Sequence, residues 1–487
     1  MRKLIVLLSV VYSLCALAQE SQYEQMRGSL DESSLPLVNV IVDIAAVNRT
    51  EYVAGEIEIA DYRCRTEPDT ATVRYHCKYR IRGGSATRYD KKSFAVKLTD
   101  ETGADLDANL FGIREENSWI LDAMAIDRIR MRNRVCFDIW NAMSRTPYKT
   151  LYGNRNGTEG FFVEVFINGN YHGLYCLTDK IDRRLLGLHK AEVNDAGEVA
   201  VRGVLYKGID WNGFTDIWLR SYSEAPTDST VWNGWELQYP GDHASQATWQ
   251  PLMDLIDFCS AATPDETFRK EYRDYFHEEN LADYAVFTMA LNVGDNAYKN
   301  TFLSTVDLNL GHCYLLTPWD MDMSLGGHWD GGHDETLASI TRYNHIAPFN
   351  RLAVKDIDGF CALMSSRWIA NYATLFSREA VARRLDEYGT LFTASGAWQR
   401  EYEKWNGNPV PLEEDIFDEL QYVKDWYGEN YAGLCSQFGT PDPQGIAETS
   451  ADRPADSGMF TLDGRRVSGT AAGKGIYIVN GKKEVVR

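Results

Sequence analysis

The sequence lacks the short motifs that mark several common classes of enzyme. It contains no G-x-S-x-G, no H-E-x-x-H and no G-x-x-x-x-G-K-[ST] pattern. Serine hydrolases, zinc proteases and P-loop nucleotidases build their sites on these patterns, so none of the three classes is indicated. A zinc ribbon is not indicated either, because no two cysteines have the C-x-x-C spacing.

Positive charge is scarce. The chain has 50 Lys and Arg against 70 Asp and Glu, which gives a formal net charge of −20. Nucleic acid would be repelled by such a chain, so no nucleic-acid partner is expected. A nucleotide such as ATP is not excluded, because local cations and a bound metal can outweigh the global charge. The net charge alone would favour a basic protein partner, although solubility is its default explanation.

A long apolar run occurs only at the N-terminus. Arg2 and Lys3 are followed by an apolar stretch and by small residues at 16–18, which predicts a signal peptide over residues 1–18. No other run of about 18 apolar residues exists, so no transmembrane segment is expected. We therefore expect an exported protein that is secreted or attached to the cell surface. Residues 19–36 are polar and are interpreted as a short leader.

Eight of the nine cysteines lie beyond this signal. An even number of cysteines in an exported chain permits disulfides, and Cys64 with Cys77 could join the two arms of a hairpin. The spacing does not determine the pairing.

Hydrophobic periodicity changes along the chain and predicts an α+β fold. Strand patterns dominate residues 37–98, helical spacing covers 127–143, and a hairpin is predicted over 161–178 around the turn Asn168-Gly169. A strand is predicted at 204–207, and residues 220–435 are expected to be mostly helical, for example at 249–260, 280–293 and 378–388. The first half is thus predicted to be rich in strands and the second half in helices.

The C-terminus has a composition of its own. Residues 439–458 are rich in Pro, Asp, Ser and Gly and are interpreted as a linker. Residues 459–487 contain Asp463-Gly-Arg465 and Gly475-Ile-Tyr-Ile-Val-Asn-Gly-Lys-Lys483, which predicts a small β-module. This tail resembles the sorting signal of the type IX secretion system of Bacteroidota, which implies contact with that secretion machinery. A hairpin that caps the main domain is the alternative.

Two acidic motifs follow one another after a helical stretch. The first runs from Asp295 to Asn300. The second follows an apolar stretch, residues 314–319, that is predicted to be a strand, and it contains Asp320 and Asp322. Kinases use one Asp to position the acceptor hydroxyl, an Asn to ligate metal, and a later Asp to hold the metal on the phosphates. Magnesium suits such a sparse set of oxygens because it keeps several of its waters. The two motifs together predict metal-dependent phosphoryl transfer.

Further blocks of sequence accompany these motifs in a fixed order between residues 38 and 330. They are Arg82–Ser93, Trp119–Ala123, Met131–Arg134, Phe162–Gly169, His172–Asp182 and Val204–Lys207. With these blocks the chain resembles the CotH family of secreted, atypical protein kinases. The resemblance implies a two-lobed kinase-like fold over residues 37–438, with the N-terminal lobe at about 37–215 and the C-terminal lobe at about 216–438.

The resemblance also assigns roles to the acidic residues. Asp295 is implied to be the catalytic residue that orients the acceptor hydroxyl, and Asn300 a metal ligand. Asp320 is implied to bind metal as the Asp of the kinase D-F-G motif does. Asp322 would share the face of Asp320 in an extended chain, so either carboxylate could ligate the metal directly.

Nucleotide binding requires cations. Arg82 opens a glycine turn that could cover the nucleotide, and Lys91, Lys92 and Lys97 follow it. The resemblance favours Lys92 for the phosphates, whereas the pattern Ala-Val-Lys-Leu favours Lys97. Two further residues complete the implied site. Lys207 is a candidate for nucleotide contact, and Asp179 stands where the family often has the Glu that holds the phosphate lysine.

The implied activity is that of an exported Ser/Thr protein kinase that uses ATP with Mg²⁺ or Mn²⁺ on a protein substrate. One alternative is a non-catalytic surface module for adhesion or glycan binding. Another is a nucleotidyl or other phosphoryl transferase on the same fold, because a fold does not determine the acceptor. A transition-metal site at His328, His333 and Asp334 is less favoured, since a glycine-rich loop rarely orients two imidazoles.

Overall fold

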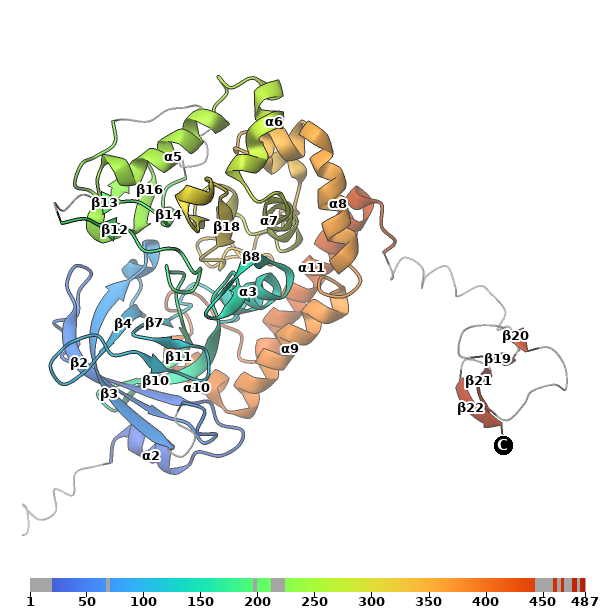
Figure 1. Cartoon of the computed structure of the whole chain (residues 1–487). Helices are drawn as coiled ribbons and strands as arrows, with labels where there is room; N and C mark the ends of the chain where they lie inside the picture. The colour runs from blue at the N-terminus through green and yellow to red at the C-terminus, as the bar shows by residue number, and fades with distance from the viewer. Residues whose placement is uncertain are drawn as a thin grey trace, which may run out of the picture. The chain divides into compact units, whose positions relative to one another are not determined.

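Alternating apolar residues in the first part of the chain fold into a closed barrel (Figure 1). The computed structural model describes residues 20–66, 71–195, 199–211 and 224–442, together with the backbone of short strands between residues 459 and 486. Alternate residues of the barrel strands, such as Ile57 and Ile59 or Val96 and Leu98, are buried in its interior. The seven strands, in their order around the barrel, are β1 (Leu37–Ile41), β10 (Gly160–Ile167), β11 (Asn170–Thr178), β7 (Ser118–Asp122), β4 (Ser93–Thr99), β3 (Thr72–Arg82) and β2 (Val53–Ala60).

The hairpin predicted around Asn168-Gly169 is present as β10 and β11. Asn168 has a φ of 49° and Gly169 a φ of 80°, the positive values that a tight two-residue hairpin turn requires. The segment interpreted as a leader contains helix α2 (Gln22–Gly28). Tyr23 of this helix is buried, and its backbone N–H donates to the carbonyl of Gly169 over 3.0 Å. The helix is therefore packed against the barrel.

Helix α3 (Arg132–Met143) is shorter than the predicted 127–143. Its start is set by Asp127, whose Oδ2 accepts from the backbone N–H groups of Met131 and Arg132 over 2.8 and 2.7 Å. Such a side chain satisfies amides at the start of a helix that have no partner within it. Residues 127–131 thus form the turn before the helix.

A second sheet interrupts the region that was expected to be mostly helical. Its order is β15 (Val231–Trp232), β16 (Trp235–Tyr239), β14 (Val204–Gly208), β17 (Thr301–Thr305) and β18 (Leu315–Pro318). The predicted strand at 204–207 is confirmed as β14, the middle strand. The strand predicted before Asp320 is confirmed as β18. The strand β17 was missed because it is buried on each face, and a short buried strand has no alternation that separates it from a helix.

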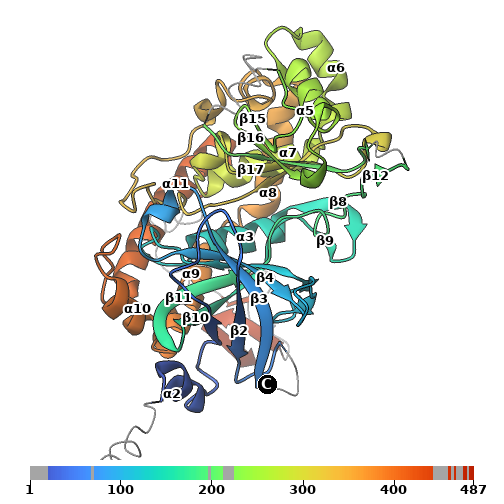
Figure 2. The same ribbon diagram turned by 90° about the vertical axis from the view of Figure 1, so that its left-hand side faces the viewer.

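Helices cover the second half of the molecule, as the sequence predicts (Figures 1 and 2). Helix α7 is buried along its whole length after its first two residues, so it is a core helix. The helices are α5 (Gln246–Cys259), α6 (Asp265–Tyr275), α7 (Glu278–Ala290), α8 (Phe360–Asn371), α9 (Arg378–Ala394), α10 (Ala397–Trp405) and α11 (Ile416–Phe438). Three two-stranded ribbons belong to the first half of the chain: β5 (Ala108–Asn109) with β6 (Glu115–Glu116), β8 (Arg145–Thr150) with β9 (Gly153–Arg155), and β12 (Glu192–Val193) with β13 (Val199–Ala200). The molecule is thus a mixed α+β structure.

The predicted disulfide between Cys64 and Cys77 is not formed. All eight cysteines of the described chain are free thiols. Cys77 is buried on β3 opposite Gly55, whereas Cys64 lies in the loop beyond the end of β2 at Ala60. The two residues are therefore offset along the hairpin and do not face each other.

The chain divides into two compact units, residues 1–434 and residues 435–487. In the second unit, four strands form an antiparallel sheet in the order β20 (Arg466–Val467), β19 (Met459–Thr461), β21 (Gly475–Val479) and β22 (Lys482–Val486). The predicted signal peptide and most of the predicted linker lie outside the described residues. None of the described helices combines the length and apolar character needed to cross a membrane.

Candidate active site

Two neighbouring strands bring the predicted acidic residues together. The strands β17 and β18 are antiparallel, and Thr301 pairs with Pro318. Asn300 precedes the first strand and Trp319 follows the second, and the N–H of Trp319 donates to the carbonyl of Asn300 over 2.8 Å. Residues that lie 20 positions apart, Asn300 and Asp320, therefore meet at one end of the second sheet.

The Asn300 amide links the two carboxylates assigned as catalytic and metal-binding. Its Nδ2 lies 3.1 Å from Oδ2 of Asp295 and 3.4 Å from Oδ2 of Asp320. The Nδ2 of Asn296 donates to the carbonyls of Asn300 and Trp319 over 2.7 and 3.0 Å, which holds the two chain segments together. The structure thus forms one cluster from both acidic motifs.

Asn300 and Asp320 share an unusual backbone conformation. Their φ angles are 54° and 56°, in the left-handed region that non-glycine residues rarely adopt. Such conformations cost about 1–3 kcal/mol each, and they persist where the surrounding structure or a function requires them. Asn300 and Asp320, whose side chains are hydrogen-bonded to each other, are therefore both held in strained backbone conformations.

Asp295 is buried within the cluster. Its side chain is 6% exposed, and its Oδ2 accepts from Lys299 Nζ at 2.9 Å as well as from Asn300. Its other oxygen, Oδ1, is buried and has no hydrogen-bond partner among the residues that the structure describes. Burial raises the pKa of Asp295 above its usual value, and the hydrogen bond and charge of Lys299 oppose that rise.

Asp322 lies among like charges. Burial raises its pKa well above the usual value, and the charges of Asp320, Asp122, Asp295 and Asp127 raise it further. A bound cation would relieve this repulsion, because it would favour the charged form of each carboxylate.

Two of the predicted cations accompany the acidic cluster. Arg82, at the end of β3, and Lys207, on β14, both lie against the ring of Trp319, at 5.3 and 5.9 Å from its centre. Burial lowers the pKa of each group, and the charge of Asp320 opposes this effect at both. Arg82 is on a strand of the barrel and Lys207 is on a strand of the second sheet. Their shared contact with the Trp319 ring therefore connects the two sheets.

The other predicted cofactor residues are bonded elsewhere. Lys92 donates to the carbonyls of Thr87 and Tyr89, within its own loop. Lys97 forms an ion pair with Asp105 at 2.9 Å. It lies four residues along β4 from Ser93, the partner of Arg82, which is about 13 Å in a strand.

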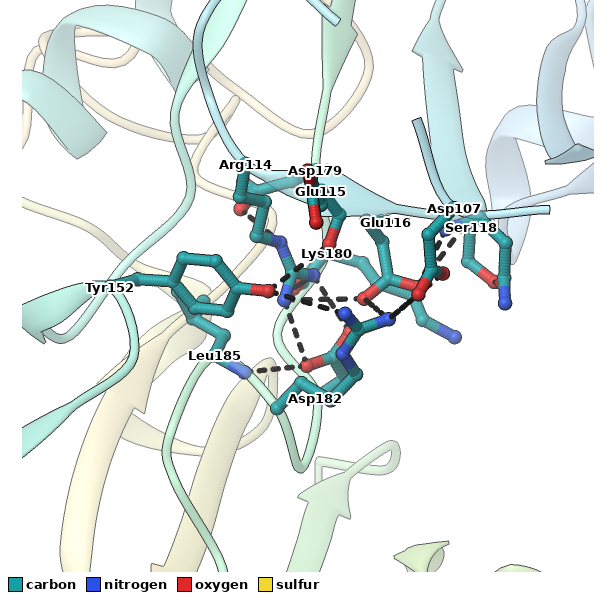
Figure 3. A network of polar contacts seen from close by, with 12 residues as sticks. Asp107, Arg114, Glu115, Glu116, Ser118, Tyr152, Asp179, Lys180, Asp182 and Leu185 are labelled. Carbon is teal, nitrogen blue, oxygen red and sulfur yellow. Dashed lines mark hydrogen bonds and ion pairs between the residues drawn. The ribbon is translucent and has the colours of Figure 1, made fainter. Parts of the chain in front are cut away.

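Asp179 does not hold the phosphate lysine. It is buried, and its Oδ2 accepts from Arg155 at 2.7 Å and lies 3.0 Å from Nε of Arg114. Figure 3 shows this network, in which Arg114 also meets Asp182 and Glu116. The expected ion pair between Asp179 and Lys92 is thus absent from the described residues.

A different lysine is held by an acid. Lys91 is completely buried, and its Nζ lies 2.6 Å from Oε1 of Glu401 on α10. Arg130 donates to the same oxygen over 2.7 Å. Burial lowers the pKa of Lys91 to about 7, although Glu401 opposes the shift. Lys91 was one of three candidate lysines in the sequence but not the favoured one, because no local pattern connects it to an acid 310 positions away.

Two further contacts were not anticipated. One is the ion pair of Lys299 with Asp295. Lys299 lies four residues after Asp295 in the first motif, and this spacing could have indicated the pair. Asn133 of α3 accepts from the N–H of Met321 over 3.2 Å and donates to Asp122 over 3.1 Å. Helix α3 is thereby attached to the second acidic motif.

The donor set fits magnesium or manganese bound together with phosphates. No three His, Cys, Asp or Glu side chains form a closed metal site in the part of the chain that the structure describes. Nucleotide-bound magnesium needs only one or two carboxylates, because phosphates and waters supply its other ligands. His328 and His333 are engaged separately, with Asp330 at 2.7 Å and Glu419 at 2.9 Å.

Comparison with known proteins agrees with this arrangement. The family model described as CotH kinase protein matches residues 79–434, which is well over half of the 487 residues. A search of curated proteins finds no match. The matched region includes Asp295, Asn300 and Asp320 as well as Lys91 and Glu401. The chain belongs to the CotH family.

Proposed function

We propose that the protein is an exported Ser/Thr protein kinase that transfers the γ-phosphate of ATP to a protein hydroxyl with Mg²⁺ or Mn²⁺. Membership of the CotH kinase family supports the kinase class. The observation that carries the proposal is the single amide of Asn300 between Asp295 and Asp320. This arrangement suits phosphoryl transfer, in which positioning and charge stabilisation do most of the work.

In this proposal the barrel and the helix-covered second sheet are the two lobes of a kinase. The strand β14 pairs with β17, so the boundary between the lobes falls before residue 204. Arg82 comes from the first lobe and Lys207 from the second. A nucleotide bound between them would contact both lobes through its phosphates.

Asp295 would orient the acceptor hydroxyl. Its Oδ2 is held by Asn300 and Lys299, which leaves Oδ1 as the acceptor for the hydroxyl proton. A buried carboxylate oxygen without a partner is costly, and a hydrogen bond from the substrate would remove that cost. Lys299 opposes the rise that burial causes in the pKa of Asp295, and so favours its ionised form.

Asn300 and Asp320 would hold the metal, with Asp322 as a direct or water-mediated ligand. The metal would neutralise charge on the transferring phosphoryl group. Arg82 and Lys207 would bind phosphate oxygens at the same place. Both cations have a pKa lowered by burial and are balanced in part by Asp320, so an added phosphate would stabilise their charged forms.

The test uses the purified chain with ATP labelled either at the γ-phosphorus or at the α-phosphorus, with a generic acceptor protein and Mn²⁺. We expect transfer of the γ-label only, and its loss in the variant Asp295→Asn. Asp330→Asn, a neutralisation in an exposed loop, serves as the matched control and should leave transfer unchanged. Transfer of the α-label would show a nucleotidyl transferase, and no transfer with several acceptors would favour a non-catalytic module.

Export is a separate part of the proposal. The signal-like residues 1–18 and the tail at 459–487 would direct the chain through the type IX machinery to the cell surface or beyond. Deletion of residues 459–487 is expected to leave the protein in the periplasm, measured by cell fractionation against the full chain. Unchanged surface display after the deletion would contradict this role of the tail.

A further inference from the structure

A basic groove lies away from the acidic cluster. It is an open hollow of about 710 Å³ between the tip of the β8–β9 ribbon, residues 149–151, and the segment 183–192, with Arg202 at one side. Five of its lining residues are Lys or Arg, and Glu192 is the one acidic residue among them. The cations are Lys149, Arg183, Arg184, Lys190 and Arg202. Such a concentration of positive charge is unexpected on a chain with a net charge of −20.

Only two of the five cations are neutralised by the protein. Arg184 meets Asp107 at 2.9 Å, and Nε of Arg202 donates to Asp307 over 2.8 Å. The remaining three, Lys149, Arg183 and Lys190, have no ion pair with any carboxylate of the described residues. Lys149 and Lys190 are exposed, and Arg183 donates to the carbonyl of Leu188 over 3.2 Å.

The wall of the groove is anchored by the network of Figure 3. Arg114 donates to the carbonyl of Lys180 over 3.1 Å and to Asp182 over 2.7 Å. Asp182 in turn accepts from the N–H of Leu185 over 2.8 Å. These bonds hold the segment that carries Arg183 and Lys190, so the groove exists before any ligand binds and little ordering is needed.

We propose that this groove binds an acidic segment of the acceptor protein in extended conformation. Its carboxylates would pair with Lys149, Arg183 and Lys190, and an apolar residue beside them would cover Leu151, whose side chain is 87% exposed at the rim. The inference rests on the proposed function in one respect, that the acceptor is a protein. The net negative charge of the whole chain would favour a basic partner. The groove is locally positive, so it would instead select acceptors that carry an acidic segment.

The shape favours a peptide over a compact phosphate. Lys149 and Lys190 are solvent-exposed point charges on flexible stems, carried by two separate segments of chain. A tightly bound phosphate is often held by converging guanidinium forks and backbone N–H groups, but two of the three arginines here, Arg184 and Arg202, are already paired with carboxylates. Dispersed cations next to an exposed leucine match a stretch in which acidic and apolar residues alternate.

The groove lies at the opposite end of the second sheet from the proposed catalytic residues. Arg202 precedes β14, whereas Lys207 is near its other end, so five residues of strand separate them. This corresponds to about 17 Å. An extended segment in the groove would therefore be at least about five residues away from the acceptor hydroxyl in the substrate.

The test measures binding of a fluorescein-labelled peptide of alternating Glu and Leu to the full chain by anisotropy, at low salt and without ATP or metal. We expect saturable binding that weakens with salt, and much weaker binding of the same peptide with Gln in place of Glu. Lys149→Glu with Lys190→Glu should weaken binding about tenfold, because two attractive pairs become repulsive. Lys270→Glu with Arg383→Glu changes the net charge equally at exposed positions on α6 and α9, and should leave binding unchanged.

An equal loss of binding in both double variants, or no binding to the wild type, would overturn the inference. Direct binding of pyrophosphate that depends on Lys149 and Lys190, measured by calorimetry and without any peptide binding, would show a small-anion site and would also overturn the inference. Thermal unfolding of each variant confirms that it is folded. Because the assay contains no nucleotide, peptide binding can succeed while phosphoryl transfer fails, and the two proposals are tested independently.

Discussion

The two oxygens of the Asp295 carboxylate have different surroundings. Oδ2 is fixed by Asn300 and Lys299, and Oδ1 is buried without a partner. Burial raises the pKa of Asp295, and a residue that orients an acceptor hydroxyl must be ionised. Activity is therefore expected to fall as the pH drops through a pKa that is higher than the usual 3.8 of an aspartate.

The variant Lys299→Met tests this account of Asp295. Without the ammonium group, burial acts on the carboxylate unopposed and its pKa rises further. The acid limb of the pH profile of kcat/KM should therefore move to higher pH, whereas Lys299→Arg should restore it towards the wild-type position. An acid limb that is unchanged in Lys299→Met would show that Asp295 does not control it.

The sequence allowed the acidic cluster to be predicted but not all of its cations. Asp295, Asn300 and Asp320 flank two consecutive antiparallel strands, so their meeting follows from a short-range pairing. The choice between Lys91 and Lys92 was harder, because adjacent residues near a strand face opposite sides. Sequence similarity could not show that the buried member of the pair is Lys91, since its partner Glu401 lies on a distant helix.

At the level of elements, a buried carboxylate on α10 connects this helix to the barrel, in addition to the ion pair of Arg400 with Glu164. Glu401 accepts from Lys91 and Arg130 and, through Oε2, from the N–H of Leu174 on β11 over 2.8 Å. All three charged side chains are fully buried. A buried charge network of this kind fixes geometry, and breaking it leaves uncompensated charge.

The variant Glu401→Gln is expected to destabilise the protein by about 3–5 kcal/mol, because it leaves Lys91 and Arg130 buried without a counter-charge. Urea unfolding followed by fluorescence measures the change. Glu387→Gln removes an exposed carboxylate beside Arg383 on α9 and should cost less than about 0.5 kcal/mol. Equal effects of the two substitutions would contradict a structural role of the buried network.

Helices and strands could be predicted from the sequence where the pattern that marks them lies within a short stretch of chain. The turn Asn168-Gly169 identified the β10–β11 hairpin, and apolar spacing located α5, α7 and α9. The closure of the barrel was not foreseen, because it depends on the parallel pairing of β1 with β10, more than a hundred residues apart. Two strands of the second sheet, β14 and β18, were predicted, but their assembly into one sheet was not, since its central pairing joins β14 to β17 across several helices.

At the level of the whole molecule, the family match and the first compact unit both end at residue 434. The strands β19 to β22 pair with one another in the second unit. Deletion of residues 459–487 is accordingly expected to leave the thermal midpoint of the remaining chain and its nucleotide binding unchanged, measured by differential scanning fluorimetry. A lowered midpoint would indicate that the tail stabilises the family domain.

The central claim is that the cluster around Asn300 binds a metal–nucleotide complex. It is tested most directly by titrating the full chain with ATP, in the presence and absence of Mn²⁺ or Mg²⁺, and following thermal unfolding. A ligand that binds only the folded state raises the midpoint, so the account predicts a metal-dependent rise that Asp320→Ala abolishes and Asp330→Ala retains. The absence of a shift with any nucleotide and metal, or the same shift in Asp320→Ala, would contradict it.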